Sequence, residues 1–447
     1  MESLPLEHNK PNTISRREFL WLTSMSAAGL LAGCAANPVT GKSQLMLISE
    51  DQEINIDKQH SPHQFSSDYG ALQDRSLNNY INETGNNIAA LSHRPHMPYS
   101  FRGVNATYIN AYAFPGGSIA ATRGILLALE NEAQLAALLG HELGHVNARH
   151  TAEQMSKGVL TNAFVGGVAA FAGTKSSALG NLANKWGMVS AGALLASYSR
   201  DNEREADALG LKYMVQSDYN PTGFVGLMDM LRRMSKYKPG AIELMFATHP
   251  MSDERYQTAV KAVHEQYRSA QNLPLSRDRY MDHTEKIRAI KKAIAEMQKG
   301  ESYMARGTYD KAEVHFNNAL NQAPLDYAGL VMMAKCQLAQ ENYDSAKRFA
   351  AKAQKVYPTE AQAYHISGFV KIHEKKFDSA HQDFANYEKL LPGNPNTIFF
   401  KGLSLEGMQQ IRESAAQYYR YLKIVNQGQK ANYAYNRLVK WGYLKQQ

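Results

Sequence analysis

The spacing of apolar residues along the chain predicts a protein built mainly from helices. After Asn131, apolar residues recur with helical periodicity at Leu135, Leu138, Leu139 and Val146. Residues with this spacing lie on one face of a helix, and an asparagine side chain is a good acceptor for the free N–H groups of a first turn. We therefore expect a buried helix that begins after Asn131 and continues past residue 146.

The stretch "NAYAFPGGSIAATRGIL", which begins at Asn110, has a different pattern. Its Pro-Gly-Gly triplet is typical of a tight turn, and the short apolar run from Ser118 to Thr122 is typical of a strand. The stretch predicts a β-hairpin. Together with the surrounding helices it indicates an α+β domain with a small sheet.

The pattern becomes repetitive after residue 292. Three related segments recur at an interval of 34 residues: "GTYDKAEVHFNNALNQAP", "ENYDSAKRFAAKAQKVYP" and "KKFDSAHQDFANYEKLLP". An aromatic residue, an aspartate, an alanine and a final proline occupy the same positions in all three. An interval of about 34 residues is typical of tetratricopeptide repeats (TPRs), in which each repeat is a pair of helices and proline ends the second one.

We expect the repeats to extend over residues 293–428, with a degenerate last copy near residues 395–428, and residues 429–447 to form a capping helix. A charged helical connector over residues 261–292 would join them to the first domain. Solenoids of this kind bind other proteins along a concave surface. The repeats therefore predict a captured substrate or a protein partner.

The first residues are expected to be an export signal. The segment "SRREFLWLTSMSAAGLLAGC" has paired arginines followed by a short apolar stretch, which is typical of a twin-arginine signal. Its last four residues resemble a bacterial lipobox, in which Cys34 would carry the lipid after removal of residues 1–33. Ala35 after the cysteine favours the outer membrane. An ordinary N-terminal helix is the alternative. We expect an exported, periplasmic, lipid-anchored protein.

Composition and charge limit the classes of protein. A chain of 447 residues with 44% hydrophobic and 20% charged residues is typical of a folded protein with more than one domain. The net charge of +8 is compatible with nucleic-acid binding. No helix-turn-helix, zinc-finger or RNA-binding motif accompanies that charge, however, so we predict no nucleic-acid partner. The only other cysteine, Cys336, lies in a repeat, where we expect it to pack.

The predicted helix after Asn131 contains the sequence His141-Glu142-Leu143-Gly144-His145. Positions four apart on a helix are separated by about 40° around its axis, so both imidazoles can reach one point, a spacing suited to Zn²⁺. The glutamate of an H-E-x-x-H motif can act as general base toward water. A buried helix with two structural histidines is the alternative interpretation.

A third ligand is needed, and the nearby His150 is not expected to supply it. His150 lies nine positions after His141, which on a continuous helix rotates it to the opposite side. In the segment that starts at Ser197, Glu203 and Asp207 are four residues apart on a predicted helix. Glu203 can bind the metal, and Asp207 can accept a hydrogen bond from a ligating histidine. A solvated, charged face of a helix is the alternative interpretation of this segment. Glu205 should point away from Glu203.

The combination of His141-Glu142-x-x-His145 with Glu203-x-x-Ala206-Asp207 resembles the metalloendopeptidase family that includes HtpX and the CAAX prenyl proteases. The resemblance covers about residues 45–260. It implies zinc as cofactor, with His141, His145 and Glu203 as ligands, Glu142 as catalytic base and Asp207 as a proton donor or a residue that orients a ligand. It also implies a zincin-type α+β fold for residues 34–260, ahead of the α-helical TPR solenoid.

The same resemblance assigns roles to two further stretches. Residues Ser118, Ile119, Ala120 and Ala121 correspond to a strand that lines the cleft, where an extended substrate adds to the edge of the sheet. A purely structural hairpin is the alternative. His249, which precedes Pro250 and Arg255, matches a His-Pro segment of the family. It would stabilise the oxyanion or act as a reversible fourth ligand, and a loop histidine without a role is the alternative.

These features favour a zinc metalloendopeptidase. The layout of export signal, H-E-x-x-H domain and TPR array resembles that of envelope proteases, which implies misfolded or stalled envelope proteins as substrates and an outer-membrane assembly machinery as a partner of the repeats. The alternative is a scaffold or chaperone whose repeats dock a partner while the metal domain is self-inhibited. The intact Glu142 argues for the enzyme, because a scaffold has no chemical need for this carboxylate.

Overall fold

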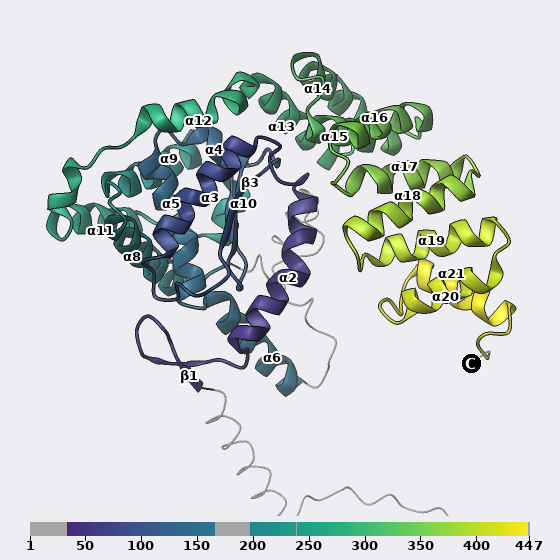
Figure 1. Cartoon of the computed structure of the whole chain (residues 1–447), viewed down its shortest axis with the longest axis horizontal. Helices are drawn as coiled ribbons and strands as arrows, with labels where there is room; N and C mark the ends of the chain where they lie inside the picture. Colours follow the sequence, from purple (N-terminus) through teal and green to yellow (C-terminus); the bar gives the residue numbers. More distant parts are fainter. Residues whose placement is uncertain (1–33, 166–196, 238, 446–447) are drawn as a thin grey trace, which may run out of the picture.

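The structure is a computed structural model that describes residues 34–165, 197–237 and 239–445. It consists of a helical domain around a small sheet and a C-terminal helical solenoid, linked by an arch of connector helices (Figure 1). This architecture confirms the expected fold class. The export segment, residues 1–33, lies outside the described residues.

The first domain begins with a two-stranded ribbon, after which helices surround a three-stranded sheet. Its elements are β1 (Cys34–Ala36), β2 (Ser43–Leu45), α2 (Glu50–Ser67), α3 (Arg75–Ala89), β3 (Ser100–Val104), β4 (Ala111–Ala113), β5 (Ser118–Thr122), α4 (Arg123–Ala128), α5 (Glu132–Asn147), α6 (His150–Val165), α8 (Arg200–Gln216), α9 (Thr222–Tyr237), α10 (Pro239–Thr248) and α11 (Asp253–Glu265). In the described part of the chain, no helix is both long and apolar enough to cross a bilayer.

The sheet has the strand order β3-β5-β4. β4 and β5 form the predicted antiparallel hairpin, in which Tyr112 is opposite Ala120. β3 pairs with β5 in parallel over its whole length. The strand Ser118–Thr122 therefore lies in the centre of the sheet, and its expected role as an edge strand is wrong. Both of its main-chain edges are already paired, and β4 and β3 are the outer strands.

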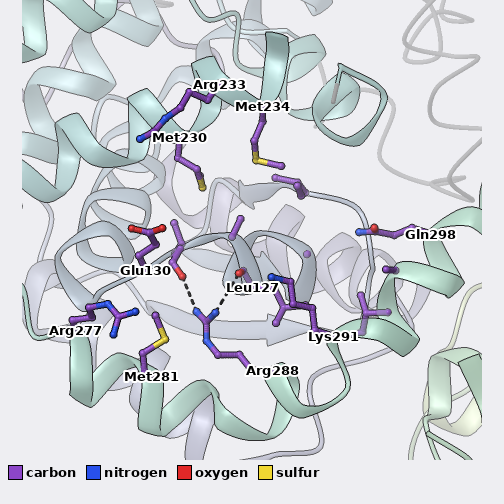
Figure 2. A pocket seen from close by; sticks show the side chains of 16 residues that line it. Leu127, Glu130, Met230, Arg233, Met234, Arg277, Met281, Arg288, Lys291 and Gln298 are labelled. Carbon is purple, nitrogen blue, oxygen red and sulfur yellow. Dashed lines mark hydrogen bonds between the residues drawn. The ribbon is translucent and has the colours of Figure 1, made fainter. Parts of the chain in front are cut away.

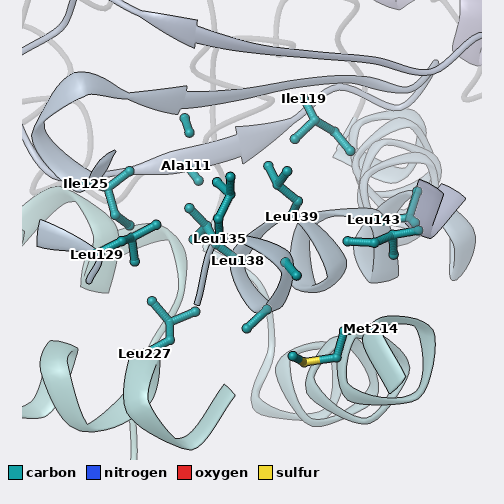
Figure 3. Close-up of a cluster of buried hydrophobic side chains, with 14 of the residues drawn as sticks. Ala111, Ile119, Ile125, Leu129, Leu135, Leu138, Leu139, Leu143, Met214 and Leu227 are labelled. Carbon is teal, nitrogen blue, oxygen red and sulfur yellow. The ribbon is translucent and has the colours of Figure 1, made fainter. Parts of the chain in front are cut away.

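Helix α5 carries the His-Glu motif and lies at the centre of the domain. Asn131 caps it by accepting a hydrogen bond from the backbone N–H of Gln134 at 2.9 Å. Its leucines pack against Ala111 and Ile119 of the sheet on one side and against Leu227 of α9 on the other (Figure 3). Every residue of α5 is buried, not only one face.

Helix α8 packs against α5 at unusually close range. Gly140 and Gly144 of α5 face Gly210 and Ala206 of α8, and a Cβ added to Gly210 would lie 2.7 Å from the backbone nitrogen of His141. Only glycine allows two helix backbones to approach in this way. The contact brings the first half of α8 beside the His-Glu motif.

Helix α5 ends at Asn147, and α6 begins as a new helix at His150. Arg149 between them has a φ of +59°, in the left-handed region. Its guanidinium holds this conformation by donating hydrogen bonds to the carbonyl oxygen of Ile48 at 2.7 Å and to Glu53 at 3.1 Å. The chain therefore turns sharply before His150.

The connector consists of η1 (Arg268–Asn272) and α12 (Arg277–Ala289), and it leads into four helix pairs. The pairs are α13 (Lys291–Ala305) with α14 (Tyr309–Gln322), α15 (Tyr327–Ala339) with α16 (Tyr343–Val356), α17 (Gln362–His373) with α18 (Phe377–Leu390) and α19 (Pro395–Gly407) with α20 (Ile411–Leu422), followed by α21 (Gln429–Lys440). The repeated alanines Ala312, Ala346 and Ala380 are fully buried, and so is Cys336.

The beginning of the solenoid packs firmly on the first domain. Arg123 donates to Asp326 at 2.6 Å, and the Tyr69 hydroxyl donates to Glu301 at 3.1 Å. Glu301 also accepts a hydrogen bond from Thr107. These buried polar contacts are directional, so they fix the first repeats relative to the first domain.

Candidate metal centre and its surroundings

Helices α5 and α8 bring three of the expected metal-binding side chains together. The Nε2 atoms of His141 and His145 are 3.2 Å apart. Glu203 lies opposite them, with Oε2 at 3.6 Å from His141 Nε2 and Oε1 at 3.4 Å from His145 Nε2. The close contact between the two helices is the reason that a residue some sixty positions away reaches this point.

His249 completes the group. It directly follows α10, and its backbone N–H donates to Met245 at 2.7 Å. Its Nδ1 atom lies 3.1 Å from Glu203 Oε1 and 3.4 Å from His141 Nε2. One atom from each of the four side chains lies within 4.8 Å of all the others, and all four residues are buried.

These distances fit a zinc ion. Zinc bound tetrahedrally at about 2.0–2.1 Å requires its ligand atoms to be roughly 3.3 Å from one another. The separations of 3.2, 3.4 and 3.6 Å among His141, His145 and Glu203 are close to that value. Two or three imidazoles with one carboxylate are also a donor set that zinc prefers. Three histidines packed this closely in the protein interior have no evident purpose without a cation.

The charges in this group influence one another. Burial alone would raise the pKa of Glu203, but the imidazoles of His249 and His145 hold the pKa of Glu203 well below its usual range. Burial lowers the pKa of His145 well below its usual range. An ionised Glu203 beside a neutral His145 suits metal binding. His249 differs, because the carboxylates of Glu203 and Glu142 outweigh the effect of burial and raise its pKa.

Asp207 lies behind His141, as expected. Its Oδ1 atom is 3.0 Å from His141 Nδ1, so it can accept a hydrogen bond that leaves His141 Nε2 free for a metal. Arg255 binds this carboxylate with two donors, at 2.6 and 2.7 Å, and contacts Glu203 Oε2 at 2.6 Å. It also donates to the carbonyl of Pro250 at 2.8 Å. Arg255 therefore links Glu203 and Asp207 of α8 to the loop that follows α10.

His150 does not lie on the opposite side of α5, so the geometric reason given above for excluding it is wrong. Because the helix breaks at Arg149, His150 folds back, and its Nδ1 atom is 2.9 Å from His145 Nδ1. Its Nε2 atom lies 3.2 Å from Glu205 Oε2. It stays outside the four-residue group and orients His145 instead.

The contacts of His150 determine which of its nitrogens carries a proton. Glu205 can only accept, so Nε2 of His150 must donate and Nδ1 must accept from His145 Nδ1. That arrangement leaves His145 Nε2 unprotonated and available for a metal. Tyr198 supports the same ring from its face, with ring centroids 3.8 Å apart. Glu205 points away from the metal group, as expected, but has a partner in His150.

Glu142 has a different environment from the other acidic residues. Both of its carboxylate oxygens are buried, and no hydrogen-bond donor reaches them from the described residues. The imidazole of His249 lies close to this carboxylate, with Nε2 at 3.7 Å from Glu142 Oε1. Burial raises the pKa of Glu142, and the imidazoles of His249 and His141 partly offset this effect. A buried carboxylate without a donor indicates a binding position for a group from outside the protein.

Sequence patterns did not identify the roles of Arg255, His150, Glu205 and Tyr198. Arg255 was visible only as part of the His-Pro segment, and nothing in its neighbourhood indicated the carboxylates it would bind. Tyr198 lies in the same stretch as Glu203, but its stacking on His145 depends on how α8 approaches α5. Each of these contacts joins segments that are distant in sequence.

Comparison with known proteins agrees with this geometry. The profile described as peptidase family M48 matches residues 75–263, and a tetratricopeptide-repeat profile matches residues 303–366. A beta-barrel assembly-enhancing protease from Yersinia pestis is 31% identical over 237 residues, which cover 52% of this chain and 48% of that protein. The metalloprotease YcaL of Escherichia coli (strain K12) is 30% identical over 196 residues, which cover 43% of this chain and 69% of YcaL.

A third relative, the metalloprotease LoiP of Escherichia coli (strain K12), is 27% identical over 256 residues, which cover 53% of this chain and 93% of LoiP. The matched region spans about half the length of the beta-barrel assembly-enhancing protease. The profile match, the two metalloprotease relatives and the four clustered side chains all concern the same domain. The chain belongs to peptidase family M48 and carries tetratricopeptide repeats after its peptidase domain.

Proposed function

We propose that this chain is a zinc-dependent metalloendopeptidase that cleaves misfolded or stalled envelope proteins, and that its TPRs recruit substrates or assembly partners. The observation that carries the proposal is the position of Glu142, a buried carboxylate without a donor, beside a group of side chains with zinc-ligand spacing. The name of the Yersinia pestis relative supports the envelope as the place of action.

In the proposed mechanism, His141, His145 and Glu203 hold the metal. When bound, zinc supplies Lewis acidity toward the peptide carbonyl and toward water. Asp207 and His150 keep the two imidazoles in the required tautomer and orientation. Glu142 removes the proton from the attacking water and delivers it to the nitrogen of the leaving amine. Arg255 holds the carboxylates of Asp207 and Glu203 in place through its contacts with both.

The substrate main chain would lie along β4 and not along β5. Asn110 and Phe114 direct their backbone groups toward β5, because Thr122 N donates to Asn110 O and Phe114 N donates to Ser118 O. By the alternation of an antiparallel strand, the backbone groups of Ala111 and Ala113 point to the other side. In the described part of the chain, no other strand pairs there. Because β4 is buried, an extended peptide adds to this edge only when the groups that cover it move aside.

Metal analysis tests the proposed cofactor. We expect about one zinc per purified chain, loss of casein cleavage after treatment with a chelator, and recovery when zinc is added back. The measurements are elemental analysis and release of casein fragments. Full cleavage by metal-free protein would contradict the mechanism, and recovery with another metal alone would contradict the choice of zinc.

The proposed localisation depends on Cys34, the first residue of β1. A lipid chain on this cysteine would tether the protein to a membrane, and we propose the outer membrane on its periplasmic side. We expect Cys34→Ala to move the protein from the membrane fraction to the soluble fraction of fractionated cells. Cys336→Ala is the matched control and should leave it membrane-bound. Retention of Cys34→Ala in the membrane would contradict the lipid anchor.

A self-inhibited state is the second candidate, and the position of His249 favours it. With Nδ1 at 3.1 Å from Glu203 and 3.4 Å from His141, this imidazole occupies the fourth corner of the donor group, where catalysis requires room for water and substrate. In this view the repeats act as a scaffold until His249 withdraws.

Replacement of His249 separates its two possible roles. We expect His249→Ala to increase casein cleavage about 5-fold while about one zinc per chain remains, because three ligands suffice for a catalytic site. The rate of cleavage per zinc-loaded chain is the measurement. A fall of about 100-fold would instead assign His249 to stabilisation of the oxyanion.

A further inference from the structure

A large cavity lies apart from the metal centre. It has a volume of about 580 Å³ and lies where α4 and α9 of the peptidase domain meet the connector helix α12 and the first repeat helix α13 (Figure 2). No residue of the proposed zinc site lines it. Its walls come from segments as distant as residues 109 and 298, so the cavity exists only because the two parts of the protein are packed together.

The lining combines an apolar floor with a basic rim. The floor includes Leu127, Met230, Met234 and Met281, all half-buried. Methionine side chains are flexible and polarizable, so a surface rich in them adapts to apolar ligands of different shape. Four cationic residues surround the floor, whereas the only acidic residue in the lining is Glu130.

Two of the four cationic side chains, those of Arg288 and Arg233, already have partners within the protein. Arg288 donates to the carbonyl of Leu129 at 2.7 Å and to Thr284 at 2.8 Å, and Arg233 pairs with Asp229 at 2.5 Å. Arg277 and Lys291 are exposed, and neither forms an ion pair with another described side chain. In Figure 2, Arg233 and Arg277 lie on opposite sides of the cavity, and Lys291 lies beside Arg288. The cavity therefore presents unneutralised positive charge above an apolar surface.

We propose that this cavity binds the free C-terminus of a polypeptide whose last residues are apolar. The carboxylate would pair with Arg277 and Lys291, and the apolar side chains would cover the methionines and Leu127. A volume of about 580 Å³ accommodates roughly four residues, if each takes somewhat less than 150 Å³ in a close-packed site.

A fatty acid has the same combination of charge and apolar surface, but the polar groups of the lining favour a peptide. Glu130 and the side-chain amide of Gln298 also face the cavity. An acyl chain would remove them from water without offering any hydrogen bond, which is costly. A peptide main chain offers N–H groups to Glu130 and to the side-chain oxygen of Gln298, whose amide nitrogen already donates to the carbonyl of Thr107 at 2.6 Å.

The position of the cavity connects it to the metal centre. Phe224, Leu227, Met228 and Leu231 of α9 line a small apolar pocket that also contains His141 and His249. Met230, Arg233 and Met234, on another face of the same helix, line the large cavity. A polypeptide bound by its C-terminus would thus lie one helix thickness away from the proposed zinc site. The binding itself does not depend on catalysis.

Fluorescence anisotropy with the full chain tests the proposal. The probe is a fluorescein-labelled octapeptide that ends in three leucines with a free carboxylate, and the same peptide with a C-terminal amide is the comparison. We expect the acid to bind about 10-fold more tightly than the amide, because a charge-assisted pair is lost in the amide. Equal binding of the two peptides, or no saturable binding, would overturn the proposal.

Variants locate the binding. Arg277→Glu and Lys291→Glu should each weaken binding of the acid about 5-fold or more and leave binding of the amide nearly unchanged. Lys292→Glu is the matched control, because Lys292 is exposed and adjacent in sequence but does not line the cavity. Met281→Ser should weaken both peptides alike. If Lys292→Glu weakens the acid as much as Lys291→Glu, the site is elsewhere.

Palmitate serves as the competitor that separates the two ligand classes. We expect palmitate to displace the peptide only at concentrations at least 10-fold above those of the unlabelled peptide acid. The proposal would be overturned if palmitate bound more tightly than the peptide and if Arg277→Glu and Lys291→Glu abolished that binding. The cavity would then be assigned to a lipid carboxylate.

Discussion

The Glu142→Gln variant should lose casein cleavage by about 1000-fold while it still contains about one zinc per chain. The amide has nearly the same size as the carboxylate but cannot accept a proton, and a positioned general base contributes about 10²–10⁴-fold to a rate. The zinc content should persist because Glu142 is not one of the side chains whose spacing fits a zinc ion. Cleavage and zinc content are measured on the same preparation.

A surface variant controls for nonspecific effects of this substitution. Glu285→Gln makes the same chemical change at an exposed position of α12, and it should alter neither cleavage nor zinc content. If Glu142→Gln still cleaves at the wild-type rate, the proposed mechanism is wrong. If the wild type contains zinc and does not cleave, the self-inhibited state gains support and His249→Ala becomes the decisive variant.

The Gly210→Val variant should lose both stability and zinc. A Cβ at this position would lie 2.7 Å from the backbone nitrogen of His141 and 2.9 Å from the carbonyl carbon of Gly140, so α8 has to move away from α5. Overpacking of this kind costs about 3 kcal/mol, which corresponds to a decrease in Tm of roughly 6–12 °C for a domain of this size. Because Glu203 moves with α8, we expect zinc affinity to fall at least about 10-fold.

Ala208→Val is the matched control for the helix. Ala208 lies on the exposed face of α8, so the same new side chain costs only the small difference in helix propensity, less than about 1 kcal/mol. Thermal unfolding and competition with a zinc chelator measure the two effects separately. Wild-type zinc affinity in Gly210→Val would show that the close contact between the helices does not position Glu203.

The sequence by itself determined the parts of the site that depend on local geometry. The four-residue spacing of His141 and His145 directs both imidazoles to one side of a helix, whatever surrounds it. The N-cap at Asn131, the hairpin before Thr122 and the repeat interval of 34 residues are similarly local, and the structure contains all three. The choice of Glu203 followed from the chemistry of zinc and from the family resemblance.

Other predictions failed because a distant segment decided the outcome. The rotation of His150 was calculated for a continuous helix, but contacts of Arg149 with Ile48 and Glu53, about a hundred residues earlier, end that helix. No glycine or proline marks the break. The strand Ser118–Thr122 was expected at an edge, but β3 pairs along it from residues that precede the hairpin.

Tertiary structure alone decided how far apart the groups are and which partners they have. The glycines of α5 and α8 set the distance that joins Glu203 to the two histidines, and Arg255 holds Asp207 and Glu203 from a third helix. The basic, methionine-lined cavity likewise requires the connector and the first repeat to pack on the peptidase domain. Sequence patterns report the period of one helix or strand. Contacts between elements depend on packing across the whole fold, which no local period records.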